Sequence, residues 1–278
     1  MKNLNISRVE QMLRVKERDC VTACGRFLSY DPLKDNLWLL NGKNGEHSAL
    51  LINSRSAFIP VLSGNDPDVK RQIPQPVFLK KFLLKRKIHS VQGIKEDVLF
   101  LENELEKMGA KTAEIVDYEL MELDKQPDDK GYLSGPPNLV MRTPKLTDLD
   151  ELAVLHAGYE KEEVLPKGSV FSPAASRVKI ANIIAGGQIL AAQICGRLVG
   201  KINVNAVSFT RYQIGGVYVH PDFRGLGIAR RMTAEFITSF IAEGRGITLF
   251  VRKSNAAARR VYASLGFSPR RDYRITYY

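Results

Sequence analysis

Cysteine is scarce in this sequence. The chain has three cysteines, Cys20, Cys24 and Cys195, an odd number at irregular spacing. This excludes a disulfide framework and favours a reduced, cytoplasmic setting. Cys20 and Cys24 lie four apart with no further metal ligands nearby, so we expect two small buried side chains on a helix. No metal site is predicted.

Long apolar runs are also missing. No stretch approaches the roughly 20 apolar residues that span a bilayer, and residues 1–7 lack the apolar segment of a signal peptide. No membrane partner is expected. The composition, 44% apolar and 26% charged, is that of a globular protein and excludes disorder along the whole chain. A length of 278 residues predicts about two domains.

Acidic residues are few in the second half of the chain. The formal net charge is +11, and from Asn138 onward there are 20 Lys and Arg against 10 Asp and Glu, so nearly all of the excess lies there. A basic domain suits nucleic acid, an anionic surface or a phosphorylated small molecule. The motifs below favour the small molecule, and nucleic acid is not expected as a partner.

One stretch combines a strand, a turn, a glycine loop and a helix. Residues 213–219 alternate as a strand, and residues 220–222 (His-Pro-Asp) form a turn signal. Two glycines follow at 225 and 227, where an amphipathic helix begins. The free amides of a helix's first turn and the helix dipole bind phosphate well.

Three kinds of phosphate loop were compared with this stretch. A Walker loop is excluded because no Gly-Lys-Ser/Thr is present. A dinucleotide fingerprint needs a third glycine where Arg230 stands, and an acidic residue where the next strand ends in Arg252 and Lys253. The pattern Arg/Gln-x-x-Gly-x-Gly/Ala fits residues 224–229 at every position. Taken alone, such a loop is also compatible with a purely structural glycine turn.

A second motif follows at residues 254–267. It predicts a short helix with a Ser-Asn start and a glycine stop at Gly266. Asn255 and Tyr262 are seven positions apart, so they share one face about 10 Å apart along the axis. With both motifs in this order, the sequence resembles the GNAT superfamily of acyl-CoA N-acyltransferases.

The resemblance implies an α/β fold with a mixed, mostly antiparallel sheet flanked by helices. We predict a GNAT domain at 138–278, a linker at 126–137 rich in proline, glycine and charge, and a smaller α/β domain at 1–125. The first domain is predicted to begin with one helix over residues 5–29. The helices and strands predicted for this domain follow a shortened version of the same order. Its glycine loop lacks the second glycine, so we predict a degenerate, non-catalytic copy of the fold. The whole chain resembles two-domain GNAT proteins.

The resemblance also implies how acetyl-CoA would be held. Gly215 and Gly216 predict a bulge that frees strand amides. Val217, Tyr218 and Val219 would then bind the pantetheine arm and the acetyl carbonyl, and Asn255 would hydrogen-bond the arm. The pyrophosphate would rest on the loop Arg224, Gly225, Leu226, Gly227, Ile228, Ala229 and Arg230.

For the chemistry, Tyr262 is the predicted general acid that protonates the departing thiolate; a half-buried structural aromatic is the alternative. Many relatives carry a glutamate as base on the strand before the loop, where this chain has Tyr212 and Gln213. Glu162 and Glu163 are therefore candidate bases, acting through an ordered water. A solvated acidic run is the alternative for this pair.

These features predict an acyl-CoA-dependent N-acetyltransferase. It would transfer an acetyl group from acetyl-CoA to a primary amine of a small molecule or amino acid, by direct attack in a ternary complex. A monomer or homodimer is expected. Three alternatives stay open: a non-catalytic acyl-CoA-binding regulator, an N-acyltransferase using a longer acyl thioester, and a nucleic-acid-binding module.

Overall fold

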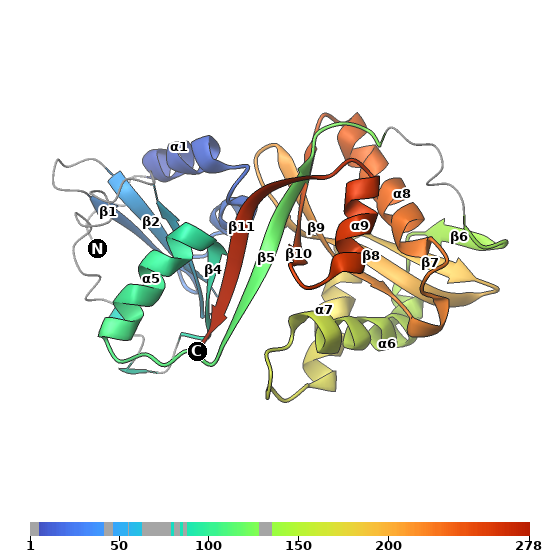
Figure 1. Cartoon of the computed structure of the whole chain (residues 1–278), viewed down its shortest axis with the longest axis horizontal. Coiled ribbons are helices and arrows are strands. Elements are labelled where there is room, and N and C mark those ends of the chain that lie inside the picture. The colour runs from blue at the N-terminus through green and yellow to red at the C-terminus, as the bar shows by residue number, and fades with distance from the viewer. Residues whose placement is uncertain are drawn as a thin grey trace.

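The computed structural model describes residues 6–41, 47–54, 56–62, 79–80, 84–85, 88–127 and 135–278. Within these ranges one sheet of 11 strands runs through the molecule, with helices on its faces (Figure 1). Its strands are β1 (Asn36–Asn41), β2 (His47–Ser54), β3 (Ala57–Leu62), β4 (Ser90–Ile94), β5 (Glu114–Leu123), β6 (Leu139–Arg142), β7 (Ile189–Ile194), β8 (Arg197–Val207), β9 (Arg211–Val219), β10 (Gly246–Arg252) and β11 (Ser268–Tyr277).

The helices come before, between and after these strands. They are α1 (Ile6–Lys16), α2 (Val21–Leu28), α5 (Lys95–Lys107), α6 (Leu149–Tyr159), α7 (Pro173–Ala185), α8 (Ile228–Ala242) and α9 (Ala256–Ser264), with the short helical turns η2 (Leu146–Asp148), η3 (Glu160–Val164) and η4 (Pro221–Phe223).

The sheet is mixed and mostly antiparallel, as predicted. Among the described strands only two neighbouring pairs are parallel, β3 with β4 and β9 with β10. In the second half the strand predicted at 213–219 lies within β9, and the helices predicted after the two motifs are α8 and α9. The chain ends in β11, which starts at Ser268.

The single helix predicted over residues 5–29 was wrong. The structure has two helices, α1 and α2, separated by a turn at 17–20. Side-chain bonds fix this turn: the Glu17 carboxylate accepts from the Thr210 amide at 2.6 Å, and Asp19 accepts from Arg270 at 2.6 Å. These tertiary contacts outweigh the local preference for a continued helix.

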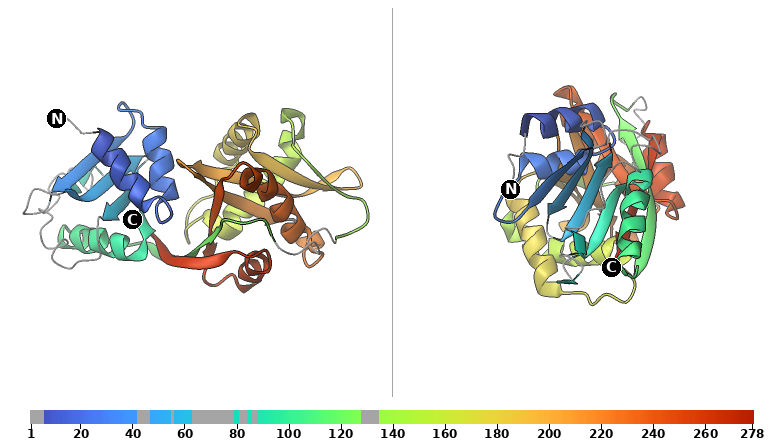
Figure 2. Two further views of the ribbon diagram at one scale, coloured as in Figure 1. Left: turned by 90° about the horizontal axis from the view of Figure 1, so that it is seen from above. Right: turned by 90° about the vertical axis from the view of Figure 1, so that its left-hand side faces the viewer.

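Two strands are exchanged between the halves of the chain. Strand order runs β4, β11, β5, β10, so β5 of the first half pairs with β10 and the final strand β11 pairs with β4. Tyr118, Leu120 and Tyr273 form a buried cluster across β5 and β11. Seen from above in Figure 2, the first half (blue) and the second (yellow to orange) lie on opposite sides of β11 (red). Each half therefore completes its sheet with a strand from the other.

The second half has a core on each face of its sheet. Neighbouring β7 residues Ala191 and Ala192 point to opposite faces, as strand geometry requires. Ala192 packs in the cluster that contains Met232 and Ile237 of α8, and Ala191 in the cluster built on α6 and α7. The sheet is thus held rigidly between α8 and the α6–α7 pair.

Of the predicted linker at 126–137, the segment 128–134 lies outside the described residues.

Candidate active site

The parallel strands β9 and β10 pair over only a short distance. Their register runs from Gly246 opposite Arg211 to Thr248 opposite Gln213. Beyond that point the strands separate, and none of the described strands pairs with β9 on this side from Ile214 onward. The fork exposes main-chain N–H and C=O groups to a ligand, at the place where open α/β sheets bind ligands.

The bulge predicted at Gly215 and Gly216 is confirmed. The register between β8 and β9 shifts between Lys201 and Asn203, and Gly216 has φ +61°. A Cβ at Gly216 would overlap the Asn203 side chain. The buried Lys201 ammonium donates to the Gly216 carbonyl at 2.8 Å, which fixes that carbonyl away from the fork.

A cavity of about 620 Å³ fills the fork. Most of its wall comes from the second half, including Val217, Glu163, Asn255 and Tyr262. The first half contributes too: Thr22 and Arg26 of α2, Gln92 of β4, and Tyr118 of β5. The cavity therefore lies where the two halves meet.

The glycine loop lies at the start of α8. Gly225 and Gly227 have φ +79° and +76°, values that L side chains rarely adopt. Residues 224–227 are exposed. In the described part of the chain, the amides of residues 225–229 donate to no backbone carbonyl. An anion can reach these amides, which the helix dipole also favours.

Tyr262 and Asn255 stand on α9, as predicted. Tyr262 lines the cavity, and its burial raises the pKa of the phenol above its usual value, with Tyr159 and Glu163 adding to the effect. The hydroxyl therefore stays protonated at neutral pH. Asn255 caps α9: its Oδ1 accepts from the Ala258 amide at 3.0 Å and its Nδ2 donates to Glu163 Oε1 at 3.0 Å.

The acidic pair Glu162 and Glu163 lies in η3, a single π-helical turn, a feature frequent at functional sites. Glu163 lines the cavity, and burial raises its pKa. Its carbonyl accepts from Arg252 at 2.8 Å. Glu162 instead pairs with Arg224 at 2.8 Å, and it accepts from the Tyr218 hydroxyl at 3.0 Å.

The structure thus divides the predicted site residues into two groups. Val217, Glu163, Asn255 and Tyr262 face one cavity. The other group joins the glycine loop to η3, since the Arg224 guanidinium contacts Glu162 and also donates to the Val219 carbonyl at 3.0 Å.

Sequence reasoning missed several residues in the cavity wall. Tyr118 and Tyr277 come from the exchanged strands and His156 and Tyr159 from α6. His156 is buried, and burial lowers its pKa to about 4, aided by the nearby Lys201 charge. No sequence signal marked Tyr118 and Tyr277, because their place depends on strand pairing between the halves.

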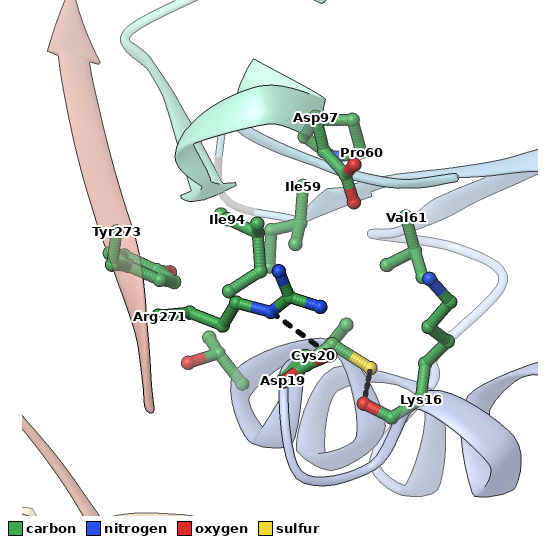
Figure 3. Close-up of a pocket in the computed structure, with 13 residues that line it drawn as sticks. Lys16, Asp19, Cys20, Ile59, Pro60, Val61, Ile94, Asp97, Arg271 and Tyr273 are labelled. Carbon is green, nitrogen blue, oxygen red and sulfur yellow. Dashed lines mark hydrogen bonds and ion pairs between the residues drawn. The ribbon is translucent and has the colours of Figure 1, made fainter. Parts of the chain in front are cut away.

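The first half has its own fork, and it is filled. Parallel pairing of β3 and β4 covers only Ala57 with Ser90 and Phe58 with Val91. The space beyond is about 20 Å³, room for about one water. Figure 3 shows the Arg271 side chain reaching across this space from β11.

Neither a membrane span nor a metal cluster is present among the described residues. No helix there has the length and apolar character to cross a bilayer, and no group of three potential metal ligands is found.

Part of the second half of the chain is similar to a known protein family. Residues 160–267 match the Acetyltransferase (GNAT) family. A curated relative, the N-alpha-acetyltransferase RimI of Mycobacterium tuberculosis, is 34% identical over 88 residues, which are 29% of this chain and 54% of that protein. The chain thus spans about half the length of this relative.

Solved structures of similar fold cover nearly the whole chain. A GCN5-related N-acetyltransferase from Sphaerobacter thermophilus has a TM-score of 0.60 at 18% identity, over 98% of this chain and 93% of that one. A Drosophila protein has a TM-score of 0.66 at 13% identity, over 99% and 97%. A tandem GNAT protein from the clavulanic acid biosynthesis pathway has a TM-score of 0.58 at 14% identity, over 98% and 96%. At these identities the likeness shows the fold. Together with the family match, it shows that the second half of the chain has the GNAT fold, with residues 160–267 matching the acetyltransferase family.

Proposed function

We propose that the protein transfers the acetyl group of acetyl-CoA to a primary amine of a small molecule or amino acid, with both substrates bound at once. One observation carries this proposal: the fork between β9 and β10 opens into a cavity of about 620 Å³ that Tyr262 and Glu163 both face. The fork supplies unpaired main-chain groups, and the two side chains supply an acid and a base.

The residues fit acetyl-CoA along its length. The amides of residues 225–229, which donate to no backbone carbonyl in the described part of the chain, suit the diphosphate, together with Arg224 and Arg230. The edge of β9 at residues 217–219, beside which no described strand lies on the fork side, suits the amides of the pantetheine arm, although the Val219 carbonyl already accepts from Arg224. Beside the bulge, a fixed amide of Val217 would stabilise the negative charge that develops on the acyl oxygen. Asn255 would use its remaining N–H for the arm.

Tyr262 is the proposed general acid. A general acid must hold its proton until the thiolate departs, and the raised pKa of this buried phenol meets that requirement. Its position on the cavity wall supports access to the departing sulfur.

Glu163 is favoured over Glu162 as the general base. It lines the cavity and has a raised pKa because it is buried, which makes its carboxylate a better proton acceptor near neutral pH. Glu162 is held by Arg224 and Tyr218, so it suits a role in fixing the glycine loop. A water between Glu163 and the acceptor amine would carry the proton.

The proposed amino-terminal domain, residues 1–125, would be non-catalytic. Support comes from its fork, where about 20 Å³ leaves no room for a pantetheine arm. It would instead act on the second domain by completing its sheet and lining its cavity, across the proposed linker at 126–137.

Two measurements test the proposed activity. Calorimetry should detect binding of acetyl-CoA, and a panel of amines should yield acetylated product with release of CoA. Gln213 stands where many relatives carry a glutamate, which favours a binding-only protein as the second candidate. Tight acetyl-CoA binding without transfer to any amine would select that candidate.

A further inference from the structure

The closed end of the fork contains a hydrogen bond between the two halves of the chain. Thr22 of α2 donates its hydroxyl to Gln213 Oε1 at 2.6 Å. Gln213 is the last residue of β9 that pairs with β10, so it stands at the closed end of the fork. Its side chain is 5% exposed and lines the cavity.

This hydrogen bond orients the Gln213 amide. Oε1 of Gln213 accepts from Thr22, and Nε2 has no hydrogen-bond partner among the described residues. Nε2 is also not among the fully buried side-chain atoms without a partner, so it is accessible. It is therefore open to the cavity. Gln213 thus presents the two N–H donors of Nε2 there.

A second carboxamide lies on the same strand surface. Asn205 is the extra residue of a bulge in β8, between Val204 opposite Ile214 and Ala206 opposite Gln213. Its Oδ1 accepts from Asn203 at 2.9 Å, so its Nδ2 is the group left for a ligand. Nδ2 lies directly over Gly215, where a Cβ would overlap it, and Asn205 lines the cavity.

Each carboxamide thus has its oxygen oriented by a donor of the protein and leaves its N–H donors for a ligand in the cavity that both residues line. Asn205 Nδ2 lies over Gly215, two positions from Gln213 on the same face of β9, and two such donors match an oxygen with two lone pairs. Near this subsite the carboxylates are already engaged: Glu160 with Lys179 at 2.7 Å, and Glu163 with Asn255. The wall therefore offers little to a second positive charge on the acceptor.

We propose that Gln213 and Asn205 bind a carbonyl or carboxylate oxygen next to the acceptor amine, and that Thr22 of the first half sets the orientation of Gln213. The acceptor is then an α-amino acid or its amide or peptide, and not a plain alkylamine or polyamine. This inference rests on the proposed function. It makes Gln213 and Asn205 specificity-determining residues and Thr22 a positioning residue.

The test compares acceptors that differ only in this oxygen. Leucine, leucinamide and a leucyl dipeptide are compared with 3-methylbutylamine, which has the same side chain and amine but no carbonyl. Initial rates of CoA release give kcat/KM for each acceptor. Each value is calculated from the concentration of the unprotonated amine. The wild type should prefer at least one oxygen-bearing acceptor by ten-fold or more, since a site built for a hydrogen bond discriminates strongly against a ligand that lacks it. Comparing the rate on leucine with the rates on leucinamide and the dipeptide shows whether the subsite binds a carboxylate or a neutral carbonyl.

Four variants locate the effect. Gln213→Leu should lower kcat/KM for the preferred acceptor about ten-fold or more and change that for 3-methylbutylamine less than two-fold. Thr22→Val should act in the same direction, and Thr22→Ser should restore wild-type values because it keeps the hydroxyl. Gln213→Glu keeps the size and the Thr22 bond but loses the donors, so it too should lose the preference. Because glutamate keeps the size of the side chain, Gln213→Glu also tests the proposal if Gln213→Leu fails to fold.

Thr248→Val is the matched control. Thr248 is buried and opposite Gln213, but its hydroxyl faces the Tyr212 carbonyl at 3.4 Å. This variant should keep the preference. Acetyl-CoA affinity should be unchanged in all variants.

Three outcomes decide. Equal rates of the wild type on all four acceptors, or equal losses on all of them in Gln213→Leu, would overturn the subsite while the acetyltransferase activity stands. A wild type that binds acetyl-CoA but acetylates no amine would overturn the proposed function, and the subsite with it.

Discussion

Glu163 and Asn255 are 92 positions apart in the chain, and their side chains are joined by a 3.0 Å hydrogen bond. The bond connects the π-helical turn η3 to the N-cap of α9. Asn255 thereby holds two elements at once, since its Oδ1 caps α9. Glu163 is held at the cavity wall by a residue of the second sequence motif, which brings the proposed base and the proposed acid Tyr262 to one site.

Glu163→Gln should remove the acidic limb of the pH–rate profile. Burial raises the pKa of Glu163, so kcat/KM should rise with pH as the carboxylate loses its proton. The glutamine cannot accept a proton, and kcat should fall about 10²-fold or more. Rates measured from pH 5 to 9 check this. Glu162→Gln is the control and should keep the limb; two superimposable profiles would remove Glu163 from the base role.

Tyr262→Phe should lower kcat by about 10²-fold, because the thiolate would depart without a positioned proton donor. Acetyl-CoA affinity should stay within about two-fold, since the ring is kept. Steady-state kinetics and calorimetry measure the two quantities. Tyr273→Phe is the matched control, a buried tyrosine at the fork of the first half, and it should leave kcat unchanged. Equal kcat values in both variants would speak against the acid role.

Lys201 should make stability depend on pH. Burial lowers its pKa from 10.5 to about 7, so between these values the unfolded chain binds a proton that the folded chain does not. Its contribution to the free energy of unfolding should rise with pH by up to about 1.4 kcal/mol per unit between pH 7 and 9. It should fall as pH drops toward 7.

The measurement is urea unfolding of the wild type and Lys201→Met at pH 7, 8 and 9. The variant should lack the rise contributed by Lys201. Lys179→Met, at an exposed lysine of the cavity wall, is the control and should follow the wild type. Parallel curves for wild type and Lys201→Met would show that Lys201 does not titrate in this range.

The second half should not fold alone. A fragment of residues 135–278 lacks β5, so the edge of β10 would lose its pairing from Ile247 to Arg252. Arg259 would also lose its partner Glu119, 3.0 Å away. We expect an insoluble fragment, and a soluble 1:1 complex when residues 1–127 are co-expressed. Circular dichroism and size-exclusion chromatography check this, and a monomeric, active fragment would contradict it.

The uneven charge has a cause besides phosphate binding. Basic residues of the second half face acidic residues of the first across the exchanged strands: Arg274 lies 2.8 Å from Asp117, and Arg270 lies 2.6 Å from Asp19. The excess seen in the sequence is therefore in part complementarity between the halves.

Local patterns in the sequence determined the helix starts and the loop. The glycines at 225 and 227 occupy positive φ before α8, Asn255 caps α9, and Gly216 forms the predicted bulge. Each of these features depends on residues a few positions apart, whose allowed backbone angles and nearby hydrogen bonds are properties of the residues themselves.

Only the tertiary structure decided how the two halves share the sheet. The exchange of β5 and β11, and with it the entry of Tyr118, Tyr277 and Thr22 into the cavity wall, depends on which strand edges meet. A strand's own pattern of side chains gives its faces but not its neighbour, because main-chain hydrogen bonds between strands are the same for every partner.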